Sequence, residues 1–194
     1  MKEKILEATI KVFNKKGLKF TMDDIAKELS MSKKTIYTVF RDKESMFGDM
    51  VDYCFDRIKE SEEEVLCDKG LSTVEKVRKI LGVMPEGYMD IDFRQLYSLK
   101  EKYPAIYKKV EERLENGWEN TLALINQGIE EGGIRPINVQ IVKMMLEASI
   151  EQFFSRDILI RNGITYQKAL EEVVSVIVDG ITVRGEDDEQ NESM

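Results

Sequence analysis

The fold is decided by residues 21–40, TMDDIAKELSMSKKTIYTVF. Thr21 followed three residues later by Asp24 is typical of a capping box, which begins a helix that reaches about Leu29. Ser32 caps the next helix, which reaches about residue 39, so a short turn separates the two helices. Two short helices joined in this way predict a helix-turn-helix.

Apolar residues give each of these helices one face for packing. Ile25 and Ile36 provide the facing surfaces, and Ala26 is small where the helices cross. The second helix leaves cations and hydroxyl groups exposed, namely Lys33, Lys34, Thr35, Tyr37 and Thr38. These groups suit the major groove of DNA, although a short solvated helix with two lysines accounts equally well for the same residues.

Helices on either side complete the head of the protein. The spacing of Ile5 and Phe13 predicts a first helix that ends at Gly17. Asp42 caps a fourth helix that runs from residue 43 to about 67. Lys43 lies in its first turn, where the helix dipole disfavours a cation, but a DNA phosphate there would meet backbone donors and this ammonium.

Charge is distributed unevenly along the chain. Residues 1–48 have eleven Lys and Arg against seven Asp and Glu, whereas the remainder has eighteen against thirty. Phosphate binding depends on where the positive charge lies rather than on the net charge of −8. A basic head on an acidic body is compatible with DNA binding, although a local surplus of this size is common on helical surfaces.

The rest of the chain also predicts helices, the first capped by Ser72 or Thr73 and the others at about 90–102, 105–131, 138–161 and 165–184. With three prolines and few runs of β-branched residues, we expect an all-α fold of about nine helices. A three-helix head, residues 1–48, precedes a larger helical bundle, residues 49–184. The acidic tail, residues 185–194, is expected to be disordered.

Composition excludes several classes of protein. The chain has no histidine, and on one helix Cys54 and Cys67 would stand about 20 Å apart, so neither a metal site nor a disulfide is expected. Motifs such as a phosphate-binding glycine loop are lacking, so we expect no enzyme activity and no cofactor. No apolar run is long enough to span a bilayer, and a cytoplasmic protein is expected.

The head resembles the TetR family of regulators, whose pattern is matched here by Thr21, Ile25-Ala26, Ser32, Tyr37-Thr38-Val39-Phe40 and Lys43-Glu44-Ser45-Met46-Phe47. Over about residues 3–50 the resemblance is a sequence motif. Over the rest of the chain it consists of the length and the layout of the helices. It implies that Phe40 is structural and that two sets of residues contact DNA. Phosphate contacts are expected from Thr21, Tyr37 and Lys43, and groove contacts from Lys33, Lys34, Thr35 and Thr38.

Two residues depart from this pattern, because the family usually has glycine at both positions. Ser30 costs about 1 kcal/mol if the turn requires a positive φ. Lys34 replaces a close backbone approach to a base with a long cation, which suits a guanine edge or a phosphate. The fold tolerates both changes, and base preference is open.

The last two helices are too apolar for a single buried stripe. The second apolar face packs most economically on the same surface of another subunit, the alternative being a helix buried within one subunit. The resemblance implies the same homodimer. The candidate interface residues are Met145, Ser149, Phe153, Val173, Val176, Ile177 and Ile181.

Between the head and these helices the chain is rich in aromatic and methionine side chains, which can line a cavity or form an ordinary core. The resemblance implies an effector cavity. The candidate ligand-binding residues are Met84, Tyr88, Met89, Phe93, Leu96, Tyr97, Tyr107 and Trp118. The expected ligand is apolar or amphipathic.

We therefore predict a DNA-binding transcriptional regulator. It is expected to bind a near-palindromic operator in double-stranded DNA as a dimer, and to release it when a small effector shifts the body to another conformation. A DNA-bound adaptor of the same fold, which recruits a protein partner and has no small-molecule effector, is the alternative. A closed cavity in the body would favour the first.

Overall fold

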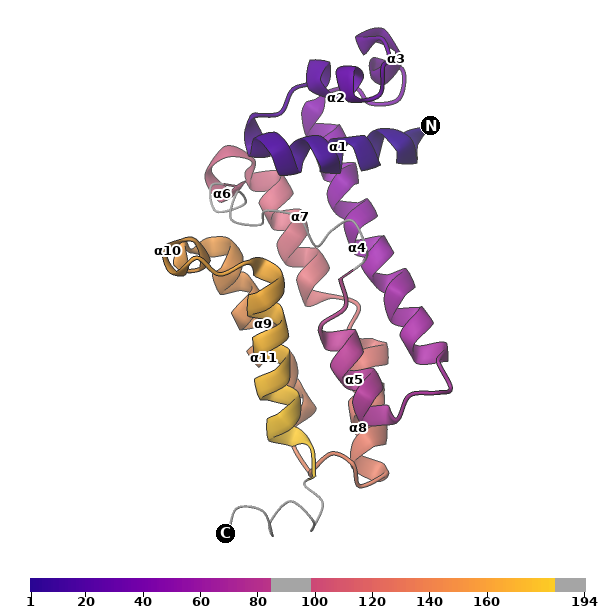
Figure 1. Ribbon diagram of the computed structural model, residues 1–194, viewed down its shortest axis with the longest axis vertical. Helices are drawn as coiled ribbons and strands as arrows, with labels where there is room; N and C mark the ends of the chain where they lie inside the picture. Colours follow the sequence, from indigo (N-terminus) through magenta and orange to yellow (C-terminus); the bar gives the residue numbers. More distant parts are fainter. Residues whose placement is uncertain (85–98, 184–194) are drawn as a thin grey trace.

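One long helix, α4 (Lys43–Cys67), connects the head to the body (Figure 1). It begins at Asp42, whose carboxylate accepts the backbone N–H of Ser45 at 2.8 Å in a capping box. The predicted start of this helix is thereby confirmed. The computed structural model describes residues 1–84 and 99–183.

The head consists of four short elements and the first turns of α4. They are α1 (Lys2–Lys16), the 3₁₀ turn η1 (Gly17–Lys19), α2 (Met22–Glu28) and α3 (Lys33–Tyr37). The predicted caps are confirmed: Thr21 and Asp24 form a capping box, and Ser32 Oγ accepts the N–H of Thr35 at 3.1 Å. α1 ends at Gly17, which has a φ of 57°. The helix-turn-helix predicted from residues 21–40 is present.

The turn between α2 and α3 contains a strained residue. Ser30 has a φ of 52°. Among the described residues, all others with a positive φ are glycines. The turn is closed by the N–H of Met31, which donates to the carbonyl of Ala26 at 2.9 Å. A side chain at this φ crowds the backbone, so the strain that the sequence predicts for Ser30 is present.

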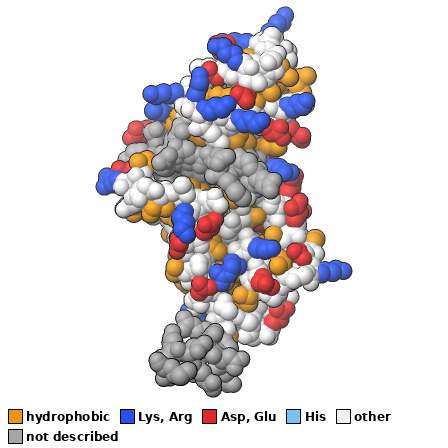
Figure 2. Space-filling view, viewed as in Figure 1, with side chains coloured by type: hydrophobic (Ala, Val, Ile, Leu, Met, Phe, Trp, Pro, Cys, Tyr) orange, Lys and Arg blue, Asp and Glu red, His pale blue; other side chains and the backbone are white. Residues whose placement is uncertain are grey.

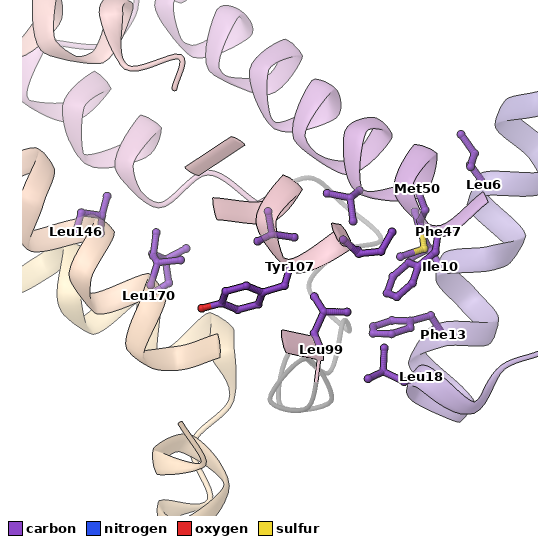
Figure 3. Close-up of a cluster of buried hydrophobic side chains, with 14 of the residues drawn as sticks. Leu6, Ile10, Phe13, Leu18, Phe47, Met50, Leu99, Tyr107, Leu146 and Leu170 are labelled. Atoms are coloured by element: carbon purple, nitrogen blue, oxygen red, sulfur yellow. The ribbon is translucent and has the colours of Figure 1, made fainter. Parts of the chain in front are cut away.

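Aromatic rings join the head to the body around α4. The Phe47 ring lies 5.7 Å from the rings of Phe13 and Phe20 and 5.6 Å from that of Tyr103. Figure 3 shows Phe13 and Phe47 facing each other between α1 and α4, with Leu18 beside them. Since Tyr103 directly precedes a helix of the body, the core of the head continues into the body without a linker.

The body is a helical bundle. It contains α5 (Thr73–Leu81), α6 (Leu99–Lys102), α7 (Pro104–Glu115), α8 (Glu119–Glu130), α9 (Val139–Ser155), α10 (Ile158–Asn162) and α11 (Tyr166–Ile181). α4 packs on α5 and α7, α5 packs on α8 and α11, and α9 packs on α8 and α11. In Figure 1, α5 and α7 lie between α4 and the pair α9 and α11.

Two ion pairs connect α4 to α7 along their length. Lys109 Nζ lies 2.5 Å from Asp52 Oδ2, and one turn further on Arg113 Nη2 lies 2.5 Å from Asp56 Oδ1. The two pairs fix the register of α7 along α4. All four side chains are at least one third exposed, so water screens both pairs.

The fold is all-α as predicted, but two of the predicted long helices are each divided. The helix expected at 105–131 is interrupted at Gly117, which has a φ of 80°. The helix expected at 138–161 ends at Ser155, and α10 begins at Ile158 without a glycine or proline between them. The described residues form helices α1 to α11, so the number of helices is close to the expected value of about nine. Most of the helix expected at 90–102 and the tail at 185–194 lie outside the described residues.

Replacing Ser30 by glycine is expected to stabilise the protein by about 1 kcal/mol, because glycine adopts a positive φ without steric cost. Urea denaturation at equilibrium measures this change. Ser30→Ala is the matched control, since it keeps a Cβ in the same conformation and should not stabilise. Equal effects of the two substitutions would contradict the assignment of strain to this residue.

Candidate nucleic-acid interface and body cavity

The helix-turn-helix places one face of α3 in solvent. α3 packs on α2, and Ile36 of α3 is fully buried, as is Ile25 of α2, with Ala26 buried beside it in sequence. The other side of α3 carries the exposed Lys33, Lys34, Tyr37 and Thr38 and the half-buried Thr35. The structure thus brings these predicted residues together on one helix, and Thr21 is exposed at the start of α2. Figure 2 shows Lys and Arg side chains gathered over the head.

The polar groups of α3 differ in how far they are already bonded. Thr38 Oγ1 donates to the carbonyl of Thr35 at 2.6 Å, and Thr35 Oγ1 lies 2.8 Å from Ser32 Oγ. In contrast, no residue within 1–84 or 99–183 hydrogen-bonds to the Lys34 ammonium or the Tyr37 hydroxyl. Lys34 and Tyr37 are therefore the groups of α3 best placed to make new contacts.

Carboxylates of α2 lie beside the cations of the head. Lys33 Nζ is 2.9 Å from Asp23 Oδ2, and this hydrogen bond raises the pKa of Lys33. Asp24 accepts hydrogen bonds from Lys16 and Thr21, which lower its pKa to about 2. Both pairs are therefore ionised at neutral pH, and Asp23 offsets part of the positive potential of α3.

Lys43 lies apart from this face. Its ammonium donates to the carbonyl of Leu18 at 2.8 Å and sits 4.2 Å from the centroid of the Phe20 ring and 5.4 Å from that of Tyr103. These contacts tie α4 to η1 and to the residue before α7. The structure thus gives Lys43 a role inside the molecule that the sequence did not indicate, and its phosphate contact stays a prediction.

A partly open cavity of about 170 Å³ lies in the body and is lined by residues of α4, α5, α7, α8, α9 and α11. Its walls are mainly apolar, as at Met50, Ile58 and Leu146. Ile10 and Phe13 of α1 also line it, so the cavity reaches the first helix of the head. A molecule bound there would contact the head and the body at once.

The cavity also contains charged side chains. Lys59 Nζ donates to both carboxylate oxygens of Glu62, at 2.9 and 2.7 Å, and to the carbonyl of Gly117 at 2.6 Å. Burial raises the pKa of Glu62, although Lys59 opposes this shift. Arg113 lines the cavity as well and is bonded to Asp56.

None of these charged residues was predicted from the sequence. A signal was available, because Glu62 follows Phe55 and Ile58 at helical spacing and so places a carboxylate on the apolar stripe of α4. A charged residue on such a stripe indicates either a partner or a binding site.

The predicted ligand-binding residues are only partly brought to this cavity. Met84 and Trp118 line it, and the Trp118 indole N–H donates to the carbonyl of Leu114 at 2.7 Å. Tyr107 is not a lining residue but is buried in the core, with its hydroxyl directed toward Leu170 in Figure 3. The others lie outside the described residues: Tyr88, Met89, Phe93, Leu96 and Tyr97.

Part of the predicted dimer surface is exposed. Val176 is 69% exposed and Met145 49% exposed, and Met144 and Ile141 extend the same apolar surface along α9. Ser149, Phe153 and Val173 are half-buried.

Ile177 and Ile181 are a correction to the predicted surface. Both are buried in the core of their own chain, on the inner stripe of α11 with Val174 and Val178. Helical spacing places this stripe on the side opposite Val176. Ile177 and Ile181 therefore contribute almost no surface to a partner.

Within residues 1–84 and 99–183, none of the helices is long and apolar enough to cross a membrane.

Comparison with known proteins agrees with this architecture. Residues 5–50 match the family described as "Bacterial regulatory proteins, tetR family". Over nearly its whole length the chain is similar to the uncharacterised helix-turn-helix regulator YvaF of Bacillus subtilis, with 28% identity over 97% of this chain and 99% of that protein. The biofilm operon negative regulator IcaR of Staphylococcus aureus is 40% identical over 57 residues, which are 29% of this chain and 31% of IcaR.

A solved structure shares the fold. The regulator FadR of Bacillus subtilis, in complex with stearoyl-CoA, superposes with a TM-score of 0.61 at 19% identity over 92% of this chain and 98% of that one. The helix-turn-helix head on a helical body thus defines a DNA-binding transcriptional regulator. The head of the chain, residues 5–50, is of the TetR family type.

Asp23→Asn is expected to strengthen binding to a random-sequence DNA duplex about two- to fivefold at low salt, because it removes an anion beside α3 and releases Lys33. Fluorescence anisotropy measures this affinity. Glu130→Gln, which removes an exposed carboxylate at the far end of α8, is the control and should leave binding unchanged. If Asp23→Asn weakens binding, this face of α3 is not the surface that meets DNA.

Proposed function

We propose that this protein is a ligand-responsive repressor, which binds a near-palindromic operator as a homodimer and releases it when a small apolar or amphipathic molecule enters the cavity. Two relatives support this proposal. IcaR is a negative regulator of an operon, and FadR was solved with a bound acyl-CoA. The cavity in the body, which is partly open and lined mainly by apolar side chains, supports this function over that of an adaptor without an effector.

The observation that carries the proposal is that α4 belongs to both sites. Its second turn holds Phe47 in the core of the head, and further along it supplies Met50, Ile58 and Glu62 to the cavity. A helix of this kind moves as a rigid body, so a change at the cavity moves the head. The proposed boundary between the DNA-binding domain, residues 1–48, and the body, residues 49–184, falls inside this helix.

For DNA recognition we propose that α3 enters the major groove. Lys34 and Tyr37 make the first contacts with DNA. Lys33 breaks its ion pair with Asp23 and binds DNA instead. Thr35 and Thr38 face base edges, while Thr21 binds a phosphate at the N-terminus of α2. The ammonium of Lys43 would have to leave the carbonyl of Leu18 to reach a phosphate.

For dimerisation we propose that the outer faces of α9 and α11 pair with the same faces of a second subunit. Met145, Ser149, Phe153, Val173 and Val176 are the proposed contacts. An exposed apolar surface on two adjacent helices is costly in water, and an isologous four-helix contact covers it. Two heads then contact half-sites about one DNA turn, or 34–36 Å, apart.

The operator is released because the ligand binds two conformations of the body with different affinities. A ligand that prefers a body conformation in which α4 is tilted lowers the population of dimers whose heads fit this spacing. The largest possible fall in DNA affinity is then set by the ratio of the ligand's affinities for the two conformations.

The double substitution Lys33→Ala with Lys34→Ala is expected to weaken operator binding by about 10- to 100-fold, because it removes two cations from the groove face. The operator is first selected with the wild-type protein from a random-sequence DNA pool, and affinity is then measured by gel shift. Lys69→Ala with Lys168→Ala removes the same charge from exposed positions of the body and should change affinity little. Unchanged binding by the first double variant rules out the proposed recognition helix.

Val176→Glu is expected to shift the protein from dimer to monomer, because it places a charge at the centre of the proposed apolar contact. Sedimentation velocity measures the shift, and operator affinity should fall with it. Asn120→Glu on the exposed face of α8 is the control. If the Val176→Glu variant remains dimeric, the dimer contact lies elsewhere.

A further inference from the structure

Among the polar groups of the cavity, the Glu62 carboxylate has acceptor positions for further hydrogen bonds. A carboxylate offers about four acceptor positions, and Lys59 Nζ takes one on each oxygen of Glu62. Glu62 is buried and lines the cavity. It can therefore accept further hydrogen bonds from a molecule in the cavity.

The donors next to Glu62 are largely committed, whereas Arg113, which also lines the cavity, has five N–H groups and directs one of them to Asp56. An ammonium has three N–H groups, and Lys59 directs its own to the two oxygens of Glu62 and to the carbonyl of Gly117. The indole of Trp118 donates to Leu114, and the amide of Asn116 donates to the carbonyl of Glu112 at 2.7 Å. Beside Glu62, a ligand is thus better matched if it donates a hydrogen bond than if it only accepts one.

The charges of the site favour a neutral ligand. Glu62 is neutralised by Lys59, and Asp56 is neutralised by Arg113. A cationic ligand would approach two cations without an unpaired anion to receive it, whereas an anionic ligand would be repelled by the Glu62 carboxylate. A charge left unpaired in an apolar cavity is strongly disfavoured.

Volume limits the size of the ligand. The cavity holds about 170 Å³, and an apolar protein cavity of about 150 Å³ accommodates benzene. A ring with a one- or two-atom substituent therefore fills it without rearrangement of the walls.

From these observations we infer that the effector is a small neutral alcohol with an apolar body of about the size of a benzene ring, whose hydroxyl donates to Glu62. This inference rests on the proposed function and specifies its ligand. The hydroxyl donates to the carboxylate, and the apolar body contacts the surrounding side chains, Met50 and Ile58 among them.

Four compounds of nearly equal size test the class of ligand on the wild-type dimer. Ethylbenzene, benzyl alcohol, benzylammonium and benzoate differ mainly in the group that would meet Glu62. Isothermal titration calorimetry is expected to detect benzyl alcohol and ethylbenzene, and to give at least about tenfold weaker binding for the two ions, which must be desolvated without a partner. Binding of either ion as tight as that of benzyl alcohol overturns the inference.

A substitution tests the role of Glu62 separately. Glu62→Gln should weaken benzyl alcohol about tenfold, which is the difference between a charged and a neutral acceptor, and should change ethylbenzene less than about twofold. Glu63→Gln, on the exposed side of the same helix, is the matched control and should affect neither. Circular dichroism verifies that each variant is folded. Equal weakening of both compounds by Glu62→Gln would assign Glu62 a structural role and contradict the inference.

Measuring operator binding in the presence of each compound tests the ligand-responsive repressor and the neutral-alcohol ligand separately. Release of DNA by benzoate or benzylammonium alone would retain the ligand-responsive repressor and reject the neutral alcohol. Binding of benzyl alcohol through Glu62 without any effect on DNA affinity would retain the ligand class and reject the effector role. If none of the four compounds binds, the neutral alcohol is rejected, whereas the ligand-responsive repressor is rejected only if operator binding is insensitive to apolar and amphipathic compounds in general.

Discussion

The structure depends on the contacts of Phe47, because this ring is the point at which the head, α4 and the body meet. Phe13 and Phe20 approach it from the head, and Tyr103 approaches it from the start of α7. Lys43, one turn earlier on α4, adds its ammonium to the Phe20 ring and to the carbonyl of Leu18. Buried rings of this kind bury large apolar areas and allow little relative motion, so the head follows the first turns of α4.

Local chemistry explains why the head could be predicted from the sequence. The caps at Thr21, Ser32 and Asp42 act within one turn of their helices, and all three hydrogen-bond as the residue types indicate. The strain at Ser30 is also local, since it follows from a single backbone angle. The same reasoning placed the residues of α3 on one exposed face.

The body could be predicted less completely, because its features depend on neighbours distant in the sequence. Gly117 ends a helix where a Cβ would lie 3.0 Å from the side chain of Lys59, a residue of α4. Tyr107 was expected at a ligand and lies in the core, and Ile177 and Ile181 were expected at a partner and lie inside their own chain. Helical periodicity identifies which residues share a stripe, but only packing determines which stripe faces inward.

The ion pairs Lys109–Asp52 and Arg113–Asp56 have a consequence for how the protein responds to ionic strength. Both are partly exposed, and salt weakens exposed ion pairs increasingly as the Debye length falls from about 10 Å at 0.1 M to about 3 Å at 1 M. Since they fix α7 along the helix that carries the head, salt weakens the orientation of the head as well as its attraction to phosphates. The slope of log affinity against log salt concentration is therefore expected to contain a conformational contribution and to exceed the value given by the phosphate contacts alone.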